Sequence, residues 1–402
     1  MSEEDEPLKT NRILMATGFT QLFSDSLNNR FNNLLVAAAG ATVHQMGFLQ
    51  GAKSLSTNLF QLVFGRLADR YGKKKFIALG RFLNAGAIAA LLFYQEPEPL
   101  IWLVILSSFF NSMSLPTWNS LLGDYTTETT RGQVIGLINS VSQMGSFVAM
   151  IIAIFMTLSQ QGDTTPFSYR VIFILSALTS FLSGLMALST MEKPPKDQRK
   201  KMQLNRLIED PRLRKYLILN FFYGIAMSFA WPFFPLIITN RLNMKIWQIS
   251  SLSLASALMN TLTQGRMGGF MDHIGRRPVV VFSRVFMSIS PAAYALSRQW
   301  WHVAIAELFL GLGMAAWQSS ESAYIIDLAP SDLRATYLAS STAAFGLASF
   351  IGSNMGGIIV DAFFHGMEGL NQGLYISSAL RLVAGLTFLT LTESMGRGGK
   401  ES

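Results

Sequence analysis

The chain has 402 residues; 50% of them are hydrophobic, 14% are charged, and none is a cysteine. Soluble domains carry about 25% charged residues, so this composition argues against a water-soluble fold. The absence of thiols excludes disulfides, thiolate metal sites and thiol catalysis, and no residue pattern calls for a metal ion or a cofactor.

Twelve segments are long and apolar enough to cross a membrane as helices. Crossing takes about 20 mostly apolar residues, because backbone polar groups find no water in the hydrocarbon core. The segments cover residues 12–38, 47–68, 76–94, 100–124, 133–158, 169–191, 214–239, 247–270, 278–296, 301–327, 335–362 and 371–392. We therefore expect an all-α membrane protein with 12 transmembrane helices. Its acidic N-terminus lacks a signal-peptide layout, so the first span is expected to direct insertion.

Lysine and arginine gather after the even-numbered spans, as in the run from Arg70 to Lys75 and again between residues 193 and 215. Cytoplasmic loops retain positive charge, so both termini are predicted to be cytoplasmic. The chain is expected to be a multi-pass protein of the cell (cytoplasmic) membrane. These loops account for the net charge of +8, and no nucleic-acid partner is indicated.

One polar motif occurs twice at a fixed spacing. GRLADRYGKK, which starts at Gly65, returns as GGFMDHIGRR at Gly268, and 268 − 65 = 203. The same offset relates the pairs Asp69/Asp272, Gly72/Gly275, Arg81/Arg284, Asp124/Asp327 and Arg131/Arg334. The chain is therefore a duplication. We expect six-span bundles at residues 1–191 and 214–402, which an even number of spans makes parallel repeats.

Residues 192–213 form the longest polar segment and are predicted to be a cytoplasmic basic linker. The pair of prolines and the charge run indicate a solvated tether. Leu204, Leu207 and Ile208 also permit a short amphipathic helix on the membrane surface, with a regulatory or anionic-lipid role as the alternative.

The stretch Gly65–Lys75 resembles the loop 2–3 signature of the major facilitator superfamily. The segments 123–132 and 327–334 are similar to its loop 4–5 and loop 10–11 elements. The resemblance covers essentially the whole chain and is nearest to multidrug-efflux-like members. The subclass stays open, because span five lacks the Gly-Pro-rich motif of drug–proton antiporters and span four lacks their arginine. The resemblance implies two bundles that rock about a substrate near the membrane midplane.

The repeated motif predicts a cytoplasmic latch in each half. Gly65 and Gly268 would let neighbouring helices approach closely. Asp69 and Asp272 would lie beside helix ends and beside the Arg131 and Arg334 guanidiniums. The resemblance implies that such a latch forms when the carrier faces outward and breaks when it faces inward; the alternative is a topology signal without a gating role. The predicted gate residues are Gly65, Asp69, Gly72, Arg81, Asp124, Arg131, Gly268, Asp272, Gly275, Arg284, Asp327 and Arg334.

Charged residues within spans are costly unless they are paired or face water, so they are candidate site residues. Asp25 lies about 13 residues into span one, roughly 20 Å along the helix. It shares a face with Gln21, Asn28 and Asn32, which would line the central cavity. Asp25 is predicted to carry a proton or substrate, or to pair with Lys53 or Arg30.

Arg30 and Lys53 could bind an anionic cargo, or they could form structural pairs with other side chains. Glu307 and Glu321 lie four turns apart on span ten with Gln318 between them, and they predict a polar strip; the alternative is pairing with Arg266 or Arg381. The predicted substrate and proton pathway contains Asp25, Asn28, Arg30, Lys53, Glu307, Gln318 and Glu321.

These features predict a secondary active transporter that works by alternating access and is coupled to protons. Export of lipophilic or cationic small molecules is preferred, because Asp25, Glu307 and Glu321 offer negative charge in an apolar setting. The alternatives are proton-coupled uptake of a small organic anion and a membrane sensor or lipid-handling protein without transport. No HExxH, GxSxG or nucleophile–base set indicates an enzyme. The expected partners are a small-molecule substrate, protons and the bilayer, and the expected state is a monomer.

Overall fold

The structure is a computed structural model, and it describes residues 5–125, 131–158, 165–192, 210–330, 333–364 and 366–394. Over these ranges the chain is helical, with short connections and no strand. The all-α prediction is therefore confirmed. The chain divides into two compact units: residues 1–45, 52–199 and 243–250 form the first, and residues 46–51, 200–242 and 251–402 form the second.

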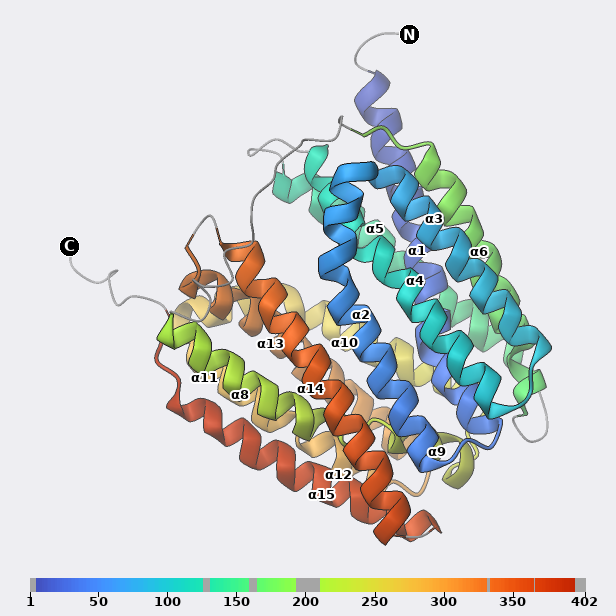
Figure 1. Cartoon of the computed structure of the whole chain (residues 1–402), viewed down its shortest axis with the longest axis vertical. Helices are drawn as coiled ribbons and strands as arrows, with labels where there is room; N and C mark the ends of the chain where they lie inside the picture. The colour runs from blue at the N-terminus through green and yellow to red at the C-terminus, as the bar shows by residue number, and fades with distance from the viewer. Residues whose placement is uncertain are drawn as a thin grey trace. The chain divides into compact units, whose positions relative to one another are not determined.

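The first unit is built mainly from six long helices (Figure 1). They are α1 (Asp5–Ala38), α2 (Val43–Tyr71), α3 (Lys73–Ala90), α4 (Pro97–Asp124), α5 (Arg131–Thr157) and α6 (Arg170–Leu188), with short 3-10 turns η1 (Leu91–Phe93) and η2 (Pro166–Tyr169). Local signals set several ends. Thr42 and Gln45 form a capping box at the start of α2, and proline, which needs no N–H partner in the first helical turn, opens α4.

The second unit contains more breaks. Its elements are α8 (Pro211–Ser228), α9 (Phe233–Leu236), the π-helical turn η3 (Ile237–Arg241), α10 (Ile246–Ile274), α11 (Arg276–Phe286), α12 (Ile289–Leu296), α13 (Trp300–Leu328), α14 (Arg334–Phe363), α15 (Gly366–Thr387) and η4 (Phe388–Thr390). Asp210 begins α8 by accepting hydrogen bonds from the backbone amides of Arg212 and Leu213.

The 203-residue offset recurs in the helix boundaries. The starts of α3 and α11, of α4 and α13, and of α5 and α14 are all separated by that number: 276 − 73, 300 − 97 and 334 − 131. The two halves differ where α3 runs unbroken from Lys73 to Ala90, whereas α11 stops at Phe286 and resumes as α12 at Ile289.

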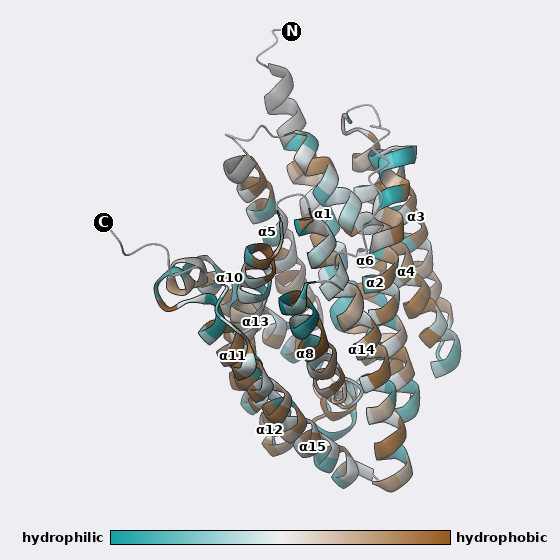
Figure 2. Cartoon of the chain, turned by 60° about the vertical axis from the view of Figure 1, so that its left-hand side comes forward, coloured by the Kyte–Doolittle hydropathy of each residue, from teal (hydrophilic) through white to brown (hydrophobic). Residues whose placement is uncertain are grey.

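Nine described segments are long and apolar enough to cross a membrane: residues 73–93, 97–124, 134–157, 166–188, 211–241, 276–296, 300–328, 336–363 and 366–390. Helices α1, α2 and α10 coincide with the other three expected spans and are 34, 29 and 29 residues long. They are long enough to cross but more polar. Figure 2 colours much of the α4 and α12 ribbons brown, the colour of apolar residues. The crossing of α1, α2 and α10 stays a prediction, and the amphipathic segment around Leu204 lies outside the described residues.

Candidate functional site

The first unit contains a closed ion pair between Asp25 of α1 and Arg81 of α3. Arg81 Nη1 donates to Asp25 Oδ1 at 2.6 Å and Nη2 donates to Oδ2 at 2.9 Å. The side chains are 0% (Arg81) and 7% (Asp25) exposed. Two parallel charged hydrogen bonds occupy both carboxylate oxygens and neutralise the buried charge.

The expected partner of Asp25 is corrected by this pair: it is Arg81, not Lys53 or Arg30. Arg81 is an expected gate residue, and the structure places it inside the first unit, bound to Asp25. The physical reason is the helical rise: Arg81 lies eight residues beyond the start of α3, about 12 Å along the axis, so the helix carries it into the bundle.

Lys53 of α2 donates to Asn32 Oδ1 of α1 at 3.0 Å, so its ammonium meets a neutral amide there. Asn28, one turn before Asn32, donates to Ser107 Oγ at 2.9 Å. Asn28 Oδ1 and Asn32 Nδ2 are buried and find no hydrogen-bond partner among the described residues. This side of α1 therefore offers both a cation and spare amide groups. Arg30 is half-buried and takes part in other interactions.

The second unit has an arginine at the equivalent position, but its partner comes from another helix. Arg284 of α11 is fully buried, and its Nη2 donates to Glu321 Oε2 of α13 in one contact of 3.3 Å. Its guanidinium lies over the rings of Trp317 at 4.2 Å and Tyr223 at 4.9 Å, which favours the cation. Arg284 Nε and Nη1 find no hydrogen-bond acceptor in the described ranges.

Arg284, another expected gate residue, is likewise carried into the interior of its unit by the helical rise. The expected partners of Glu321 are corrected too. Arg266 donates to the Leu262 carbonyl of its own helix, and Arg381 donates to backbone carbonyls and a serine hydroxyl.

Glu321 is more open and more loosely held than Asp25. Its side chain is 22% exposed. Besides Arg284, it accepts from Trp317 Nε1, from Ser341 Oγ at 3.0 Å and from Asn220 Nδ2 at 3.4 Å. Of the four donors that share the Glu321 carboxylate, only Arg284 carries a charge, whereas both oxygens of Asp25 are bound by one guanidinium. Gln318 lies nearby on α13 but is exposed.

Aromatic rings gather around Glu321. Trp317 packs against Tyr223 at 5.7 Å and against Phe345 at 5.4 Å, and Phe345 contacts Trp231 at 6.3 Å between ring centroids. We call Glu321, Trp317, Phe345 and Trp231 the acidic aromatic cluster. Ring faces attract positive charge, and the Trp317 face already carries the Arg284 guanidinium at 4.2 Å.

Glu307 does not share this setting. It is 3% exposed, and its Oε1 accepts a 2.6 Å hydrogen bond from the Tyr294 hydroxyl on α12. Tyr294 in turn packs on Phe234 at 4.7 Å. The expected strip along α13 is therefore divided into a buried carboxylate and a partly exposed one.

Arg381 of α15 binds the break between α11 and α12. Pro291 has no N–H to bond the Met287 carbonyl four residues earlier. Arg381 Nη1 supplies a donor to that carbonyl at 3.2 Å and bonds Ser290 Oγ at 3.0 Å. The same side chain also contacts the end of α8, where the chain breaks before α9: Arg381 Nη2 donates to the Met227 carbonyl. The buried guanidinium thus links α15 to α8 and to the α11–α12 segment.

Charged clusters form where α2 meets α3 and where α10 meets α11. Lys73 Nζ lies 2.6 Å from Asp124 and 3.9 Å from Asp69. In the second half, Arg276 lies 2.7 Å from Asp272 and 3.3 Å from Asp327. The aspartates therefore meet the basic residue of their own motif.

The predicted partners Arg131 and Arg334 are not the ones observed. Arg334 is exposed, and the side chain of Arg131 lies outside the described ones. The reason is proximity: the basic residue four positions after each aspartate lies just across the glycine break.

Two glutamates complete these clusters, and both were missed in the sequence. Glu192 Oε2 accepts from the Lys74 amide at 2.8 Å, and Glu393 Oε1 accepts from the Arg276 amide at 2.9 Å. Each carboxylate thus meets the N-terminus of α3 or α11, where the helix dipole favours negative charge. Their separation is 393 − 192 = 201, so the 203-residue comparison passed over them.

The glycines that matter are Gly72 and Gly275. Their φ angles are 104° and 96°, and a Cβ would lie 2.9 Å from a Glu192 oxygen or 2.6 Å from a Glu393 oxygen. A Cβ on Gly65 would meet Pro116 at an ordinary 3.7 Å, so the prediction that Gly65 permits close helix approach is wrong for this conformation. The surroundings of Gly268 lie outside the described side chains.

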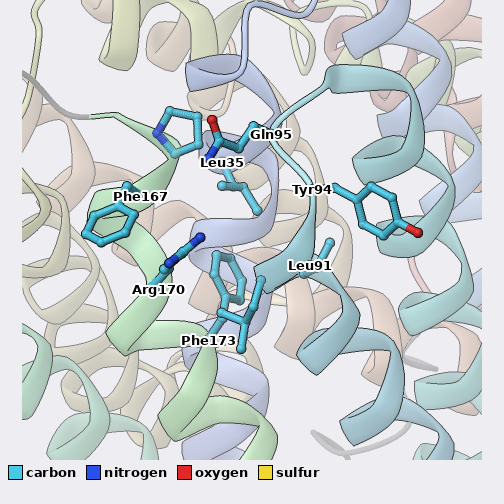
Figure 3. Close-up of a pocket in the computed structure, with 9 residues that line it drawn as sticks. Leu35, Leu91, Tyr94, Gln95, Phe167, Arg170 and Phe173 are labelled. Carbon is cyan, nitrogen blue, oxygen red and sulfur yellow. The ribbon is translucent and has the colours of Figure 1, made fainter.

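One pocket of the first unit is too small for a solute. Figure 3 shows Arg170 and Phe173 of α6 beside Leu35 of α1 and Leu91. Its cavity volume is about 10 Å³, space for at most one water. Among the described residues, no group of three His, Asp or Glu side chains could hold a metal ion.

Duplicated halves, spanning helices and buried charges define a membrane transport protein. The profile of the Major Facilitator Superfamily matches residues 14–215 and 216–401, and the chain belongs to that family. The predicted resemblance is confirmed, and membership indicates a transporter rather than an enzyme.

Relatives and solved structures agree with this assignment. The chain is 21% identical over 358 residues to the MFS-type transporter MJ1560 of Methanocaldococcus jannaschii, covering 87% of this chain and 90% of that one. It is 22% identical to the multi-drug resistance efflux pump PmrA of Streptococcus pneumoniae, covering 88% and 89%. Among solved structures, the nucleoside transporter NupG matches with a TM-score of 0.74 at 15% identity over 95% and 98% of the chains. A D-xylose–proton symporter matches with 0.71 at 14% identity over 96% and 99%.

Proposed function

We propose that the chain is a proton-coupled secondary transporter that exports lipophilic or cationic small molecules across the cell membrane by alternating access. The observation that carries this proposal is Glu321. It is partly exposed, it is bound to Arg284 by a single 3.3 Å contact, and it lies in the acidic aromatic cluster. The similarity to PmrA, an efflux pump, supports the direction of transport.

Exchange at one carboxylate explains the coupling. Ionised Glu321 attracts a cationic cargo, whereas protonated Glu321 does not, so proton and cargo compete for one group. If the transporter switches between its inward-facing and outward-facing states only when Glu321 holds either a proton or the cargo, each cycle exchanges cargo for protons. Asp25 has a different role in this proposal: both of its oxygens are bound to Arg81, so it stabilises the first bundle.

The topology proposed with this function keeps all 12 spans, both termini in the cytoplasm and a monomer. The two bundles are residues 1–191 and 214–402, joined by the linker 192–213. The clusters around Asp69 and Asp272 are proposed as cytoplasmic gates. The capping of α3 by Glu192 and of α11 by Glu393 supports this, because a gate needs contacts that can break as units.

Uptake of a small organic anion is the second candidate, and Lys53 favours it. Its ammonium lies 3.0 Å from the neutral Asn32 amide oxygen, and the Asn32 Nδ2 donor has no acceptor among the described residues. A carboxylate cargo would satisfy both groups.

Flux in proteoliposomes distinguishes the two candidates. A cationic dye and a set of organic acids are each tested under an imposed pH gradient. For export of cations, Glu321→Gln should lower proton-driven dye flux by about tenfold or more, because a charged contact contributes about 1.5–3 kcal/mol, while Lys53→Met leaves it unchanged. The reverse pattern, with organic-acid flux lost in Lys53→Met, would select the second candidate. No proton-driven flux of either class by the wild type would exclude both.

A further inference from the structure

A cavity opens on the flank of the second unit between the α11–α12 segment and α13. Its volume is about 250 Å³. We call it the lateral groove; its walls include Phe286, Ile289 and Ala293 on one side and His302, Ala306 and Phe309 on the other. The α13 members recur every three or four residues, so they form one helix face about 10 Å long.

The helix break before α12 and small side chains shape this groove. Pro291, in the first turn of α12, has no N–H for the Met287 carbonyl, which accepts from Arg381 instead. Ala293 and Ala306 leave space between the two walls. At one end the rings of Phe286 and Phe309 close the groove with centroids 6.4 Å apart.

The groove faces the surroundings of the span. Ile289, Ile305 and Phe309 line it and are 54%, 48% and 53% exposed. In a span these exposed apolar side chains meet lipid chains. The volume exceeds the roughly 150 Å³ of an engineered apolar cavity that binds benzene, so the groove has room for part of an acyl chain.

At its other end the groove is lined by His302, which is preceded in the chain by a basic residue. Arg298 is exposed just before α13 begins, and Trp301 is 48% exposed, as expected of aromatic residues at a membrane interface. His302 Nδ1 accepts from the backbone amides of Arg298 and Gln299 at 3.3 and 3.1 Å. The ring proton is therefore on Nε2, which is left as a donor at the groove.

We propose that the lateral groove binds a phospholipid with an anionic headgroup. One acyl chain lies between α12 and α13 and ends at the Phe286–Phe309 pair. The phosphate lies near Arg298 and the His302 Nε2–H. Charge complementarity selects the headgroup, since one basic side chain near the membrane surface favours an anionic lipid by about fivefold.

The first half lacks the features that build this site. At the offset of 203 residues, Pro291 corresponds to Ile88, Arg298 to Gln95 and Ile305 to Trp102. The residues that build the groove therefore occur only in the second half of the repeat. The equivalent surface of the first half is a matched control. Leu106, the counterpart of Phe309, is 41% exposed.

Photolabelling tests the proposal in the full-length protein reconstituted in nanodiscs. Phosphatidylglycerol that carries a photoactivatable acyl chain is cross-linked, and labelled peptides are identified by mass spectrometry. Labelling is expected to concentrate on residues 286–293 and 302–310, about fivefold above labelling around Leu106 and about fivefold above that obtained with phosphatidylcholine. Ala306→Trp should reduce it to the level around Leu106, whereas Leu106→Trp should not change it.

Arg298→Gln keeps the groove and should remove only the preference for phosphatidylglycerol. Competition in the wild type by unlabelled phosphatidylglycerol against phosphatidylcholine gives the same answer without any substitution. Equal labelling of both halves, or equal labelling of Ala306→Trp and Leu106→Trp, would show ordinary surrounding lipid and overturn the proposal. Transport is not the readout, so the outcome is independent of the cargo.

Discussion

Removing one partner of the ion pair between Asp25 and Arg81 should destabilise the protein strongly. Asp25→Asn leaves the Arg81 guanidinium, which is 0% exposed, without its counter-charge. Removing one partner of a buried pair costs about 3–5 kcal/mol, because the other charge stays buried and uncompensated. Replacing both partners, in Asp25→Asn with Arg81→Gln, removes the uncompensated charge and should recover more than half of that loss.

The expected change in melting temperature follows from chain length. With about 2.1 cal/mol/K per residue, the 402 residues give an unfolding entropy of about 0.8 kcal/mol/K. A loss of 3–5 kcal/mol then lowers the unfolding midpoint by about 4–6 °C when the chain unfolds as one unit. The 7 tryptophans report this transition by intrinsic fluorescence in detergent.

Glu321→Gln is the matched control for this experiment. Glu321 has one 3.3 Å contact with Arg284 and is 22% exposed, so its loss should lower the midpoint by less than half as much as Asp25→Asn. A shift of Asp25→Asn below about 1 °C, or strictly additive effects of the two single substitutions, would refute the reasoning about the closed pair.

Three further changes test the rest of the structure. Gly72→Ala should destabilise by about 1–3 kcal/mol, because φ is 104° and the new Cβ meets Glu192; Gly65→Ala should stay within about 0.5 kcal/mol, and equal midpoints for the two would contradict this. Arg381→Met should lower the unfolding midpoint, and adding Pro291→Ala should restore part of it, because the new N–H can bond the Met287 carbonyl; additive losses in thermal unfolding would argue against this role. Glu393→Gln should cost about 0.3–1 kcal/mol and more at low salt, since it removes a charge from the start of α11; a salt-independent midpoint would contradict a dipole effect.

The repeat could be predicted from the sequence with single-residue accuracy. The pairing of side chains could not. The 203-residue offset anticipates the starts of α3 and α11, because duplicated segments fold alike. The partner of Arg81 depends on how α1 is rotated against α3, which the offset does not contain. Asp25 corresponds to Ser228 and Glu321 to Trp118. The carboxylate that pairs with the equivalent arginine therefore comes from a non-equivalent helix in each half.

Some missed features left a readable signal. Glu192 and Glu393 follow the last helices of their halves, but a two-residue difference in spacing separates them from the offset used. Pro291 lies inside an expected span, and a proline there predicts a break with a freed carbonyl. Arg381, a cation in another span, could have been matched to it. The loose contact between Arg284 and Glu321 had no such signal, because its length depends on packing by Trp317 and Tyr223.

Proton release on cargo binding tests the exchange at Glu321 most directly. A lipophilic cation is added to the purified protein in weakly buffered detergent solution, and the released protons are titrated. The wild type should release about one proton per cation bound at a pH where the coupling group is protonated in the free protein, as should Asp25→Asn after correction for folded protein. Glu321→Gln should release none. Undiminished release from Glu321→Gln, or release that disappears only in Asp25→Asn, would contradict the account.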